Sequence, residues 1–210
     1  MMKSITPKTR HWDQVPLGRL IIETRNGLYK PDTFYGSGIP ILKMFNIGRL
    51  DGTWNLERVD RLRLTKHEHE LFALSSGDLL VNRVNSRELV GKCAVVDKRT
   101  EGSVFESKNM RLRVDPGMVL PEWVAYWLNA VGGRDQLDAK MKQAIGQATI
   151  NRGDLDSITL PLPPLPEQRR LAGRLREQLA AVADARTAIQ AQLAAVERLP
   201  AALLREVFGG

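Results

Sequence analysis

The chain has 210 residues, of which 43% are hydrophobic and 26% are charged, a balance typical of soluble globular proteins and not of disordered chains. Lys and Arg number 31 against 24 Asp and Glu, so the formal net charge is +7, which suits a polyanionic partner without identifying one. The single cysteine, Cys93, excludes an intrachain disulfide and a cysteine-rich zinc site. No apolar run approaches the roughly 20 residues that cross a bilayer, and the first seven residues lack the apolar core of a signal peptide, so the expected compartment is the cytoplasm.

Residues 1–160 are predicted to form a mixed α+β domain with strands separated by turns. Strands are expected at residues 15–24, 39–44, 61–65, 79–84, 90–96 and 109–114. In the last of these, Met110, Leu112 and Val114 alternate with Arg111 and Arg113. This alternation predicts one buried side and one side that faces solvent.

Two helices are expected after these strands. Pro121 suits a first helical turn, and the apolar residues at 123, 124, 127 and 128 form one face. Gly132 and Gly133 are expected to end this helix. A second helix is predicted over residues 135–145, because Leu137, Met141 and Ile145 recur at a spacing of four.

The composition changes at about residue 161. Residues 161–166 contain four prolines, which predicts a stiff extended connector between the domain and the remainder of the chain. Residues 167–208 contain eleven Ala and no Lys, a composition that favours helix. Residues 1–160 carry 24 basic against 19 acidic side chains, so the basic excess belongs mainly to the domain.

Residues 167–210 are predicted to form a long helix that pairs as an antiparallel coiled coil. Apolar residues recur every seven positions there, a repeat typical of a seam for a second helix. The candidate dimer-interface residues are Leu175, Leu179, Val182, Ile189, Leu193 and Val196. Arg186 and Pro200 interrupt the seam, and Pro200 is expected to end or kink the helix near Leu199.

From residue 167 to residue 199 this helix would be roughly 50 Å long at 1.5 Å per residue, too long for its own domain to cover. We therefore expect a partner helix, from a second copy or from another protein. The alternative is that the helix folds back on its own domain.

No catalytic or metal-ligating set emerges from the sequence. His67 and His69 are alternate residues without a third ligand nearby, and a solvated loop is the expected setting. Cys93 lies in an apolar run, where a buried structural thiol is expected in place of a nucleophile. A stand-alone enzyme is therefore disfavoured.

Three segments carry residue types suited to nucleic acid, since Arg can bond guanine, Asn can bond adenine, and Lys and Ser suit phosphates. The candidate DNA-binding residues are Arg25, Asn26, Tyr29 and Lys30 in residues 24–30; Arg83, Asn85, Ser86 and Arg87 in residues 82–87; and Lys140, Lys142 and Gln147 in residues 140–149. For each segment, an ordinary surface turn or loop is the alternative.

Several motifs follow one another along the chain: the opening at residues 12–17, Asn82-Arg83-Val84-Asn85-Ser86, Glu88-Leu89-Val90-Gly91-Lys92, Gly146-Gln147-Ala148-Thr149-Ile150, and the proline-rich junction at residues 160–170 that precedes a long helix. In this order they resemble the specificity subunit of type I restriction–modification systems. The junction is the most specific of them. The resemblance covers one unit of a family whose usual members carry two recognition domains and two helices, so it implies a half-length form.

This resemblance implies a non-catalytic subunit whose domain reads one half of a split DNA site. The helix would act as spacer and as platform for methylation subunits, which bind S-adenosylmethionine and methylate adenine, and a restriction subunit could join. The chain itself would hold no cofactor. A lone half would restore the full geometry as a homodimer, which predicts an inverted-repeat site. The rival hypothesis is a coiled-coil protein-interaction module without sequence-specific DNA binding.

Overall fold

The computed structural model describes residues 12–49 and 51–209, and the described chain divides into two compact units with the boundary between Arg169 and Arg170. Residues 1–11 of the predicted domain lie outside the described residues. The elements, in chain order, are β1 (Gln14–Pro16), the 3₁₀ turn η1 (Leu17–Arg19), β2 (Ile21–Asn26), η2 (Asp32–Phe34), β3 (Tyr35–Leu42), η3 (Met44–Asn46), β4 (Asp60–Leu62), α1 (Lys66–Phe72), β5 (Leu79–Asn82), β6 (Val84–Asn85), β7 (Cys93–Val95), β8 (Val104–Phe105), β9 (Asn109–Val114), α2 (Pro121–Asn129), α3 (Val131–Lys140), β10 (Lys142–Ala144), β11 (Gln147–Thr149), α4 (Arg152–Asp156), β12 (Thr159–Pro161) and α5 (Leu165–Phe208).

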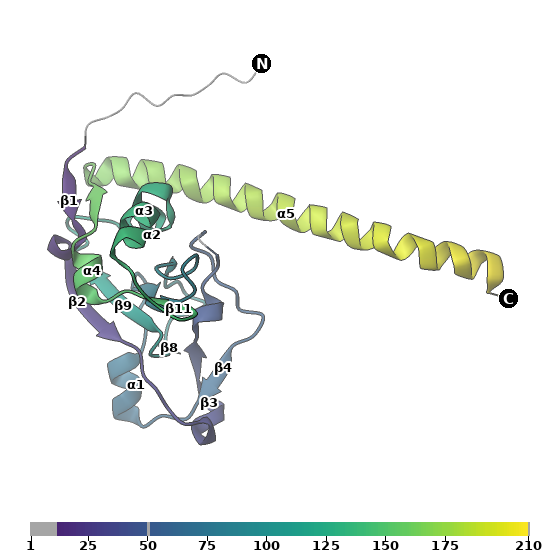
Figure 1. The fold of residues 1–210 in the computed structure, drawn as a ribbon, viewed down its shortest axis with the longest axis horizontal. Coiled ribbons are helices and arrows are strands. Elements are labelled where there is room, and N and C mark those ends of the chain that lie inside the picture. The colour runs from purple at the N-terminus through teal and green to yellow at the C-terminus, as the bar shows by residue number, and fades with distance from the viewer. Residues whose placement is uncertain (1–11, 50, 210) are drawn as a thin grey trace, which may run out of the picture. The chain divides into compact units, whose positions relative to one another are not determined.

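The first unit is built from small sheets (Figure 1). Its largest sheet is antiparallel with the order β2-β9-β5-β7, and a second sheet, β4-β3-β8, contains one parallel pair. A three-stranded sheet has the order β10-β11-β6, and β1 pairs with β12. The mixed sheets with a long C-terminal helix confirm the predicted α+β class.

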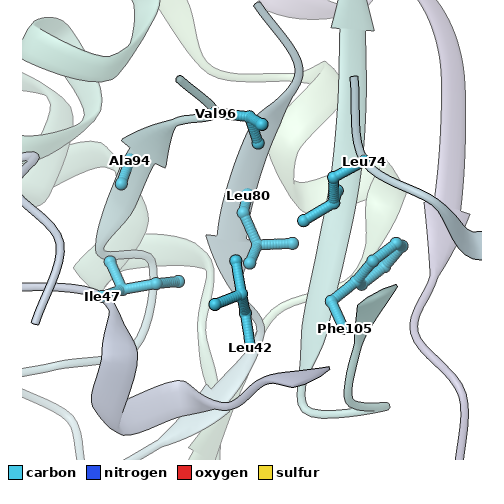
Figure 2. Close-up of a cluster of buried hydrophobic side chains, with 7 residues drawn as sticks. All are labelled: Leu42, Ile47, Leu74, Leu80, Ala94, Val96 and Phe105. Carbon is cyan, nitrogen blue, oxygen red and sulfur yellow. The ribbon is translucent and has the colours of Figure 1, made fainter. Parts of the chain in front are cut away.

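The core lies where residues from β3, β5, β7 and β8 meet. Seven buried side chains, shown in Figure 2, form one cluster: Leu42, Ile47, Leu74, Leu80, Ala94, Val96 and Phe105. Trp54 packs against this cluster, and its indole Nε1 donates to the Val95 carbonyl at 2.8 Å. Burial of each large aliphatic side chain contributes about 1.5–3 kcal/mol. Cys93 is buried in β7, as expected for a structural thiol, and its burial raises the pKa of the thiol.

Strand β9 coincides with the predicted strand, but its polar side is not solvent-facing as predicted. Arg111 is only 3% exposed, because its guanidinium donates to the Ala73 carbonyl at 3.0 Å and to the Glu23 carboxylate. Arg113 donates to Asp78 at 2.8 Å and to Glu23 at 2.7 Å. Alternation could not reveal this, because the acids that compensate the two charges come from β2 and from the turn before β5.

A buried amide network fixes the place where β5 gives way to β6. Asn82 is fully buried, and its Nδ2 donates to the Lys108 carbonyl at 2.9 Å and to Asn109 Oδ1 at 3.0 Å. Its Oδ1 accepts from Asn85 Nδ2 at 2.7 Å. Asn109 in turn donates to the Leu42 carbonyl at 3.3 Å. Because buried polar groups must be paired, these bonds specify one path for the chain after β5.

Several predicted elements differ from the structure for local reasons. Residues 15–24 do not form one strand, since η1 separates β1 from β2. His67 and His69 lie in α1 and not in a loop, because Thr65 caps this helix by accepting from the Glu68 N–H at 3.2 Å. Within the described residues, no group of three His, Cys, Asp or Glu side chains is placed to hold a metal ion.

The glycines at 132 and 133 do not end a helix but lie inside α3. The chain leaves α2 earlier, at the extended residue Ala130. A Cβ on Gly133 would lie 2.1 Å from the Trp127 carbonyl oxygen, so this glycine permits close packing of the two helices. The predicted helix over 135–145 is also wrong after Lys140, because Met141 is extended and β10 follows.

The prolines around α5 take different structural positions from those predicted. Pro161 belongs to β12, opposite Gln14, and α5 begins at Leu165, with Pro166 in its first turn, where a missing N–H costs nothing. Pro200 does not end the helix, which runs without interruption to Phe208 (Figure 1). None of the helices among residues 12–49 and 51–209 is both long and apolar enough to cross a membrane.

The amide network makes a testable contribution to stability. The Asn82→Leu substitution would leave Asn109 Oδ1 and Asn85 Nδ2 without the hydrogen bonds that they make to Asn82, each at a cost of about 1–3 kcal/mol. We expect the free energy of unfolding, measured in urea, to fall by at least about 2 kcal/mol. The exposed Asn26 serves as control, since Asn26→Leu should stay within about 0.5 kcal/mol of wild type. An unchanged urea midpoint for Asn82→Leu would contradict the role assigned to the network.

Candidate nucleic-acid interface

The first two predicted segments meet at one turn, residues 105–109, which connects β8 to β9. Leu28 exchanges backbone hydrogen bonds with this turn, donating to the Phe105 carbonyl at 3.0 Å and accepting from the Ser107 N–H at 2.9 Å. Arg83 reaches the same turn from the other segment. Its backbone N–H donates to the Lys108 carbonyl at 2.8 Å, and its Nη1 donates to the Ser107 carbonyl at 3.3 Å.

The third segment joins the second through the β6–β11 pairing. Ala148 is opposite Asn85 and Thr149 is opposite Val84, and the Ile150 N–H donates to the Arg83 carbonyl at 3.0 Å. Residues 24–30, 82–87 and 140–149 therefore form one connected set, which we call the three-segment surface. The structure brings together all three of the segments that the sequence singled out.

Two arginines of this surface have donors left over. Arg25 Nε and Arg83 Nε are buried without a hydrogen-bond partner, and they are two of four such atoms among the described residues. The Arg25 guanidinium lies 5.7 Å from the Phe72 ring centroid, and its Nε is 3.9 Å from Glu23, too far for a hydrogen bond. Because both Nε atoms are shielded from solvent, they are not themselves open to a ligand.

Other candidate side chains are already engaged within the protein. Arg87 forms an ion pair with Asp138 at 3.1 Å. Both ends of the Asn85 amide are used, since Nδ2 donates to Asn82 and Oδ1 accepts from the Ser86 N–H at 2.8 Å. Lys30 pairs with Glu68 and lies 4.8 Å from the Phe34 ring centroid.

The remaining candidates are open to solvent or partly so. Tyr29 is 80% exposed, and Asn26, Lys142 and Gln147 are exposed as well. The structure gives the side chains of Asn26, Lys142 and Gln147 no hydrogen bond or ion pair with any described residue. Lys140 is half-buried in the last turn of α3. Ser86 lies between Asn85 and Arg87 and is half-buried.

Sequence reasoning missed the residues that hold these segments together. Ser107 and Lys108 supply the carbonyl groups at the meeting point, and Arg152 donates to Thr24 Oγ1 at 2.8 Å. The polar run at 106–109 between two apolar strands indicates a turn, but nothing local indicates which segments it contacts. Lys92 was missed too. It is buried, its Nζ donates to the Ile47 carbonyl at 2.7 Å, and burial lowers its pKa.

The predicted seam lies on the single helix α5 and is open to solvent. Leu175, Val182, Ile189, Leu193 and Val196 are between 37% and 64% exposed. Leu179 is half-buried. Large aliphatic side chains repeated on one face of a helix and left this exposed need a cover, which a second helix can supply.

Comparison with known proteins agrees with the motifs, although no family model matches the chain. The chain is 30% identical over 203 residues to the type I restriction enzyme StySPI specificity subunit of Salmonella potsdam. It is also 28% identical over 211 residues to the EcoKI specificity subunit of Escherichia coli K12. The chain is similar in sequence to type I specificity subunits. The two alignments cover 95% and 99% of this chain but 43% and 45% of those subunits, so it spans about half the length of the curated relatives it matches.

Two solved structures of other proteins have a fold similar to that of this chain. A chain from a study of complex assembly and conformational transition in a type I restriction–modification system aligns with a TM-score of 0.64 and 22% identity. It is matched over 92% of this chain and 46% of its own length. The HsdS subunit of Thermoanaerobacter tengcongensis aligns with a TM-score of 0.61 and 20% identity, over 95% of this chain and 50% of its own.

The Lys30–Glu68 pair gives a prediction about pH. The side-chain bond from Lys30 and the backbone N–H of Thr65 lower the pKa of Glu68 to about 2. Because the folded-state pKa is depressed, the stabilisation is present above the ordinary carboxyl pKa and is lost as the pH falls toward 2. Lys30→Gln should move the pKa of Glu68 back toward its ordinary value, as measured by NMR titration of the carboxyl carbon.

The control for this titration is Lys66→Gln, which removes a neighbouring lysine that pairs with Glu70 on the same helix. The pKa of Glu68 should stay near 2 in that variant. If Lys30→Gln leaves the titration of Glu68 unchanged, Lys30 is not held by this carboxylate and is free for another partner.

Proposed function

We propose that this chain is a DNA-reading subunit that contacts one half of a bipartite duplex site through the three-segment surface. The observation that carries the proposal is the connection of three basic and amide-rich segments that are distant in sequence. Two of them meet at the turn at 105–109, and the third pairs with the second through β6 and β11. The exposed side chains of the surface support it, since Lys142 suits phosphate oxygens and the amides of Asn26 and Gln147 suit base edges. Similarity to type I specificity subunits points the same way.

The contacts already made within the surface divide its residues by role. Asn85 and Arg87 are held by Asn82 and Asp138, so we assign them to positioning of the loop after β6. Asn26, Lys142 and Gln147 have no such bonds and are the side chains available to DNA. Arg83 is held by the turn through its Nη1 but is only half-buried, so we assign it a DNA contact through the rest of its guanidinium.

The second part of the proposal is that two copies pair through α5. A parallel pair would place Arg186 against Arg186 and Pro200 against Pro200, because equal seam positions meet. In an antiparallel pair centred near residue 191, Arg186 meets Val196 beside Glu197, and Leu175 meets Val207. Antiparallel pairing thus avoids a like-charge contact in the seam, and it buries every apolar seam residue from 175 to 207.

A two-fold pair of readers has consequences for the whole complex. Two identical recognition units related by a two-fold axis read an inverted repeat whose spacer is set by the helices. This chain would contribute recognition and not chemistry. S-adenosylmethionine and adenine methylation would belong to a methylation subunit assembled on the helix pair, and a restriction subunit could join.

Arg83 is the side chain whose removal tests DNA recognition most directly. Selection from a random duplex pool at physiological salt should yield a preferred DNA sequence. The Arg83→Ala variant should bind that sequence more weakly by about 1–3 kcal/mol and should show relaxed preference at one base pair. Arg83→Lys keeps the charge but loses the bidentate fork, so it should recover phosphate contact and not base preference. Circular dichroism confirms that both variants fold.

The matched control is Arg99→Ala, which removes an arginine that is bonded to Asp97. It should bind the selected duplex like wild type. Absence of any preferred sequence from the pool would favour the protein-interaction module over the DNA reader.

Pairing through α5 is tested by placing charges in the seam. Val182→Glu with Ile189→Glu would bury two carboxylates against the second helix, so we expect the dimer mass measured by light scattering at micromolar concentration to halve while residues 12–169 stay folded. Ala181→Glu with Ala188→Glu adds the same charges on exposed positions beside the seam and should leave the dimer intact. A monomeric wild type, or an unchanged mass for the seam variant, would refute pairing through this face.

A further inference from the structure

Ile145 occupies the tip of the β10–β11 hairpin and is fully exposed, more than any other large apolar side chain that the structure describes. The turn itself does not call for isoleucine. The residue of this turn with a left-handed backbone conformation is Gly146, whose φ of +76° suits glycine. Single exposed aliphatic residues are common, so the position must be judged from its surroundings.

The hairpin around Ile145 is polar on one face and anchored on the other. Lys142 is opposite Thr149, and Gln147 lies two residues before Thr149, so these three side chains share a face. Ala148, on the other face, is buried and pairs with β6. Strand β6 pairs with β11 only at Ala148 and Thr149, so the end of the hairpin at residues 144–147 is a short two-stranded ribbon that extends the β10-β11-β6 sheet of the three-segment surface. Lys142 and Gln147 place an unpaired cation and an amide on its outer face.

We propose that this ribbon enters the major groove and that Ile145 contacts the 5-methyl group of a thymine. The inference rests on the proposed function and adds a specificity-determining residue to it. A two-stranded ribbon fits the major groove, about 12 Å wide, whereas the minor groove, about 6 Å wide, is too narrow for it. The thymine methyl is the apolar group that a base pair presents in the major groove, so it is the partner for an aliphatic tip.

The flanking residues fit the same placement. A cation at Lys142 suits the phosphates that border the groove, and the amide of Gln147 can bond an adenine edge. Ile145 is uncharged, so its contact should add preference without adding salt dependence. A tip that contacts another protein would show no dependence on a thymine methyl group. The same holds for a tip that inserts as a wedge between base steps.

The test replaces thymines by deoxyuridine, which removes only the 5-methyl group. In the duplex selected by the full-length chain, each thymine is replaced singly and affinity is measured by fluorescence anisotropy. The affinity of the wild-type chain should fall about threefold to fivefold when one particular thymine is replaced. This is the effect expected from the loss of one methyl group that is buried in the contact. Ile145→Ala should bind the parent duplex correspondingly more weakly, with the same salt slope, and should not respond to deoxyuridine at that position.

Two variants control the experiment. Ile145→Val keeps a branched apolar tip and should retain the response to deoxyuridine. Val131→Ala removes apolar surface from an exposed residue of α3 and should also retain it.

The contact is refuted if wild type responds to deoxyuridine nowhere, or if Ile145→Ala keeps the response. It is equally refuted if 2-aminopurine fluorescence shows base unstacking that depends on Ile145, which would indicate a wedge. Failure to select any preferred duplex would overturn the proposed function along with this inference, whereas a selected duplex without methyl dependence overturns only the inference.

Discussion

The buried side chain of Asn82 is the constraint on which the candidate interface depends. Its amide bonds to Lys108, Asn109 and Asn85 fix the end of β5, the start of β6 and the turn at 105–109 relative to one another. Arg83 follows directly. Its N–H and Nη1 bond to the turn at 105–109, and its carbonyl accepts from the Ile150 N–H. A fully paired buried network of this kind excludes alternative paths, because each displaced amide would lose its partners in an apolar setting.

A different constraint governs the second unit. Helix α5 carries an apolar seam over many turns, and its own side chains cannot cover it. Its first turn is held in the first unit by the buried Gln168, which accepts from the Leu120 N–H at 2.9 Å and donates to the Pro163 carbonyl at 2.8 Å. The proposed recognition surface and the proposed pairing seam thus lie in separate parts of the chain.

Local sequence pattern predicts the elements whose secondary structure does not depend on pairing with distant residues. Strict alternation predicted β9 at residues 109–114, and Pro121 with its apolar face predicted α2. Pattern failed where pairing with distant residues decides the structure. The spacing of Ile145 from Leu137 and Met141 predicts a helix, yet this stretch forms a hairpin because β11 pairs with β6. Gly133 was interpreted as a stop, yet close packing against Trp127 explains it. Residue type identifies the three candidate segments, but their connection through the turn at 105–109 and the β6–β11 pairing depends on non-local backbone bonds that composition does not encode.

Co-expression of the chain with a type I methylation subunit, followed by genome-wide mapping of methylated adenine, tests the central claim most directly. The account predicts methylation within an inverted repeat of two half-sites with a spacer of fixed length and no sequence preference. An asymmetric motif, or methylation without any motif, would contradict the claim that two copies of this chain each read half of a site.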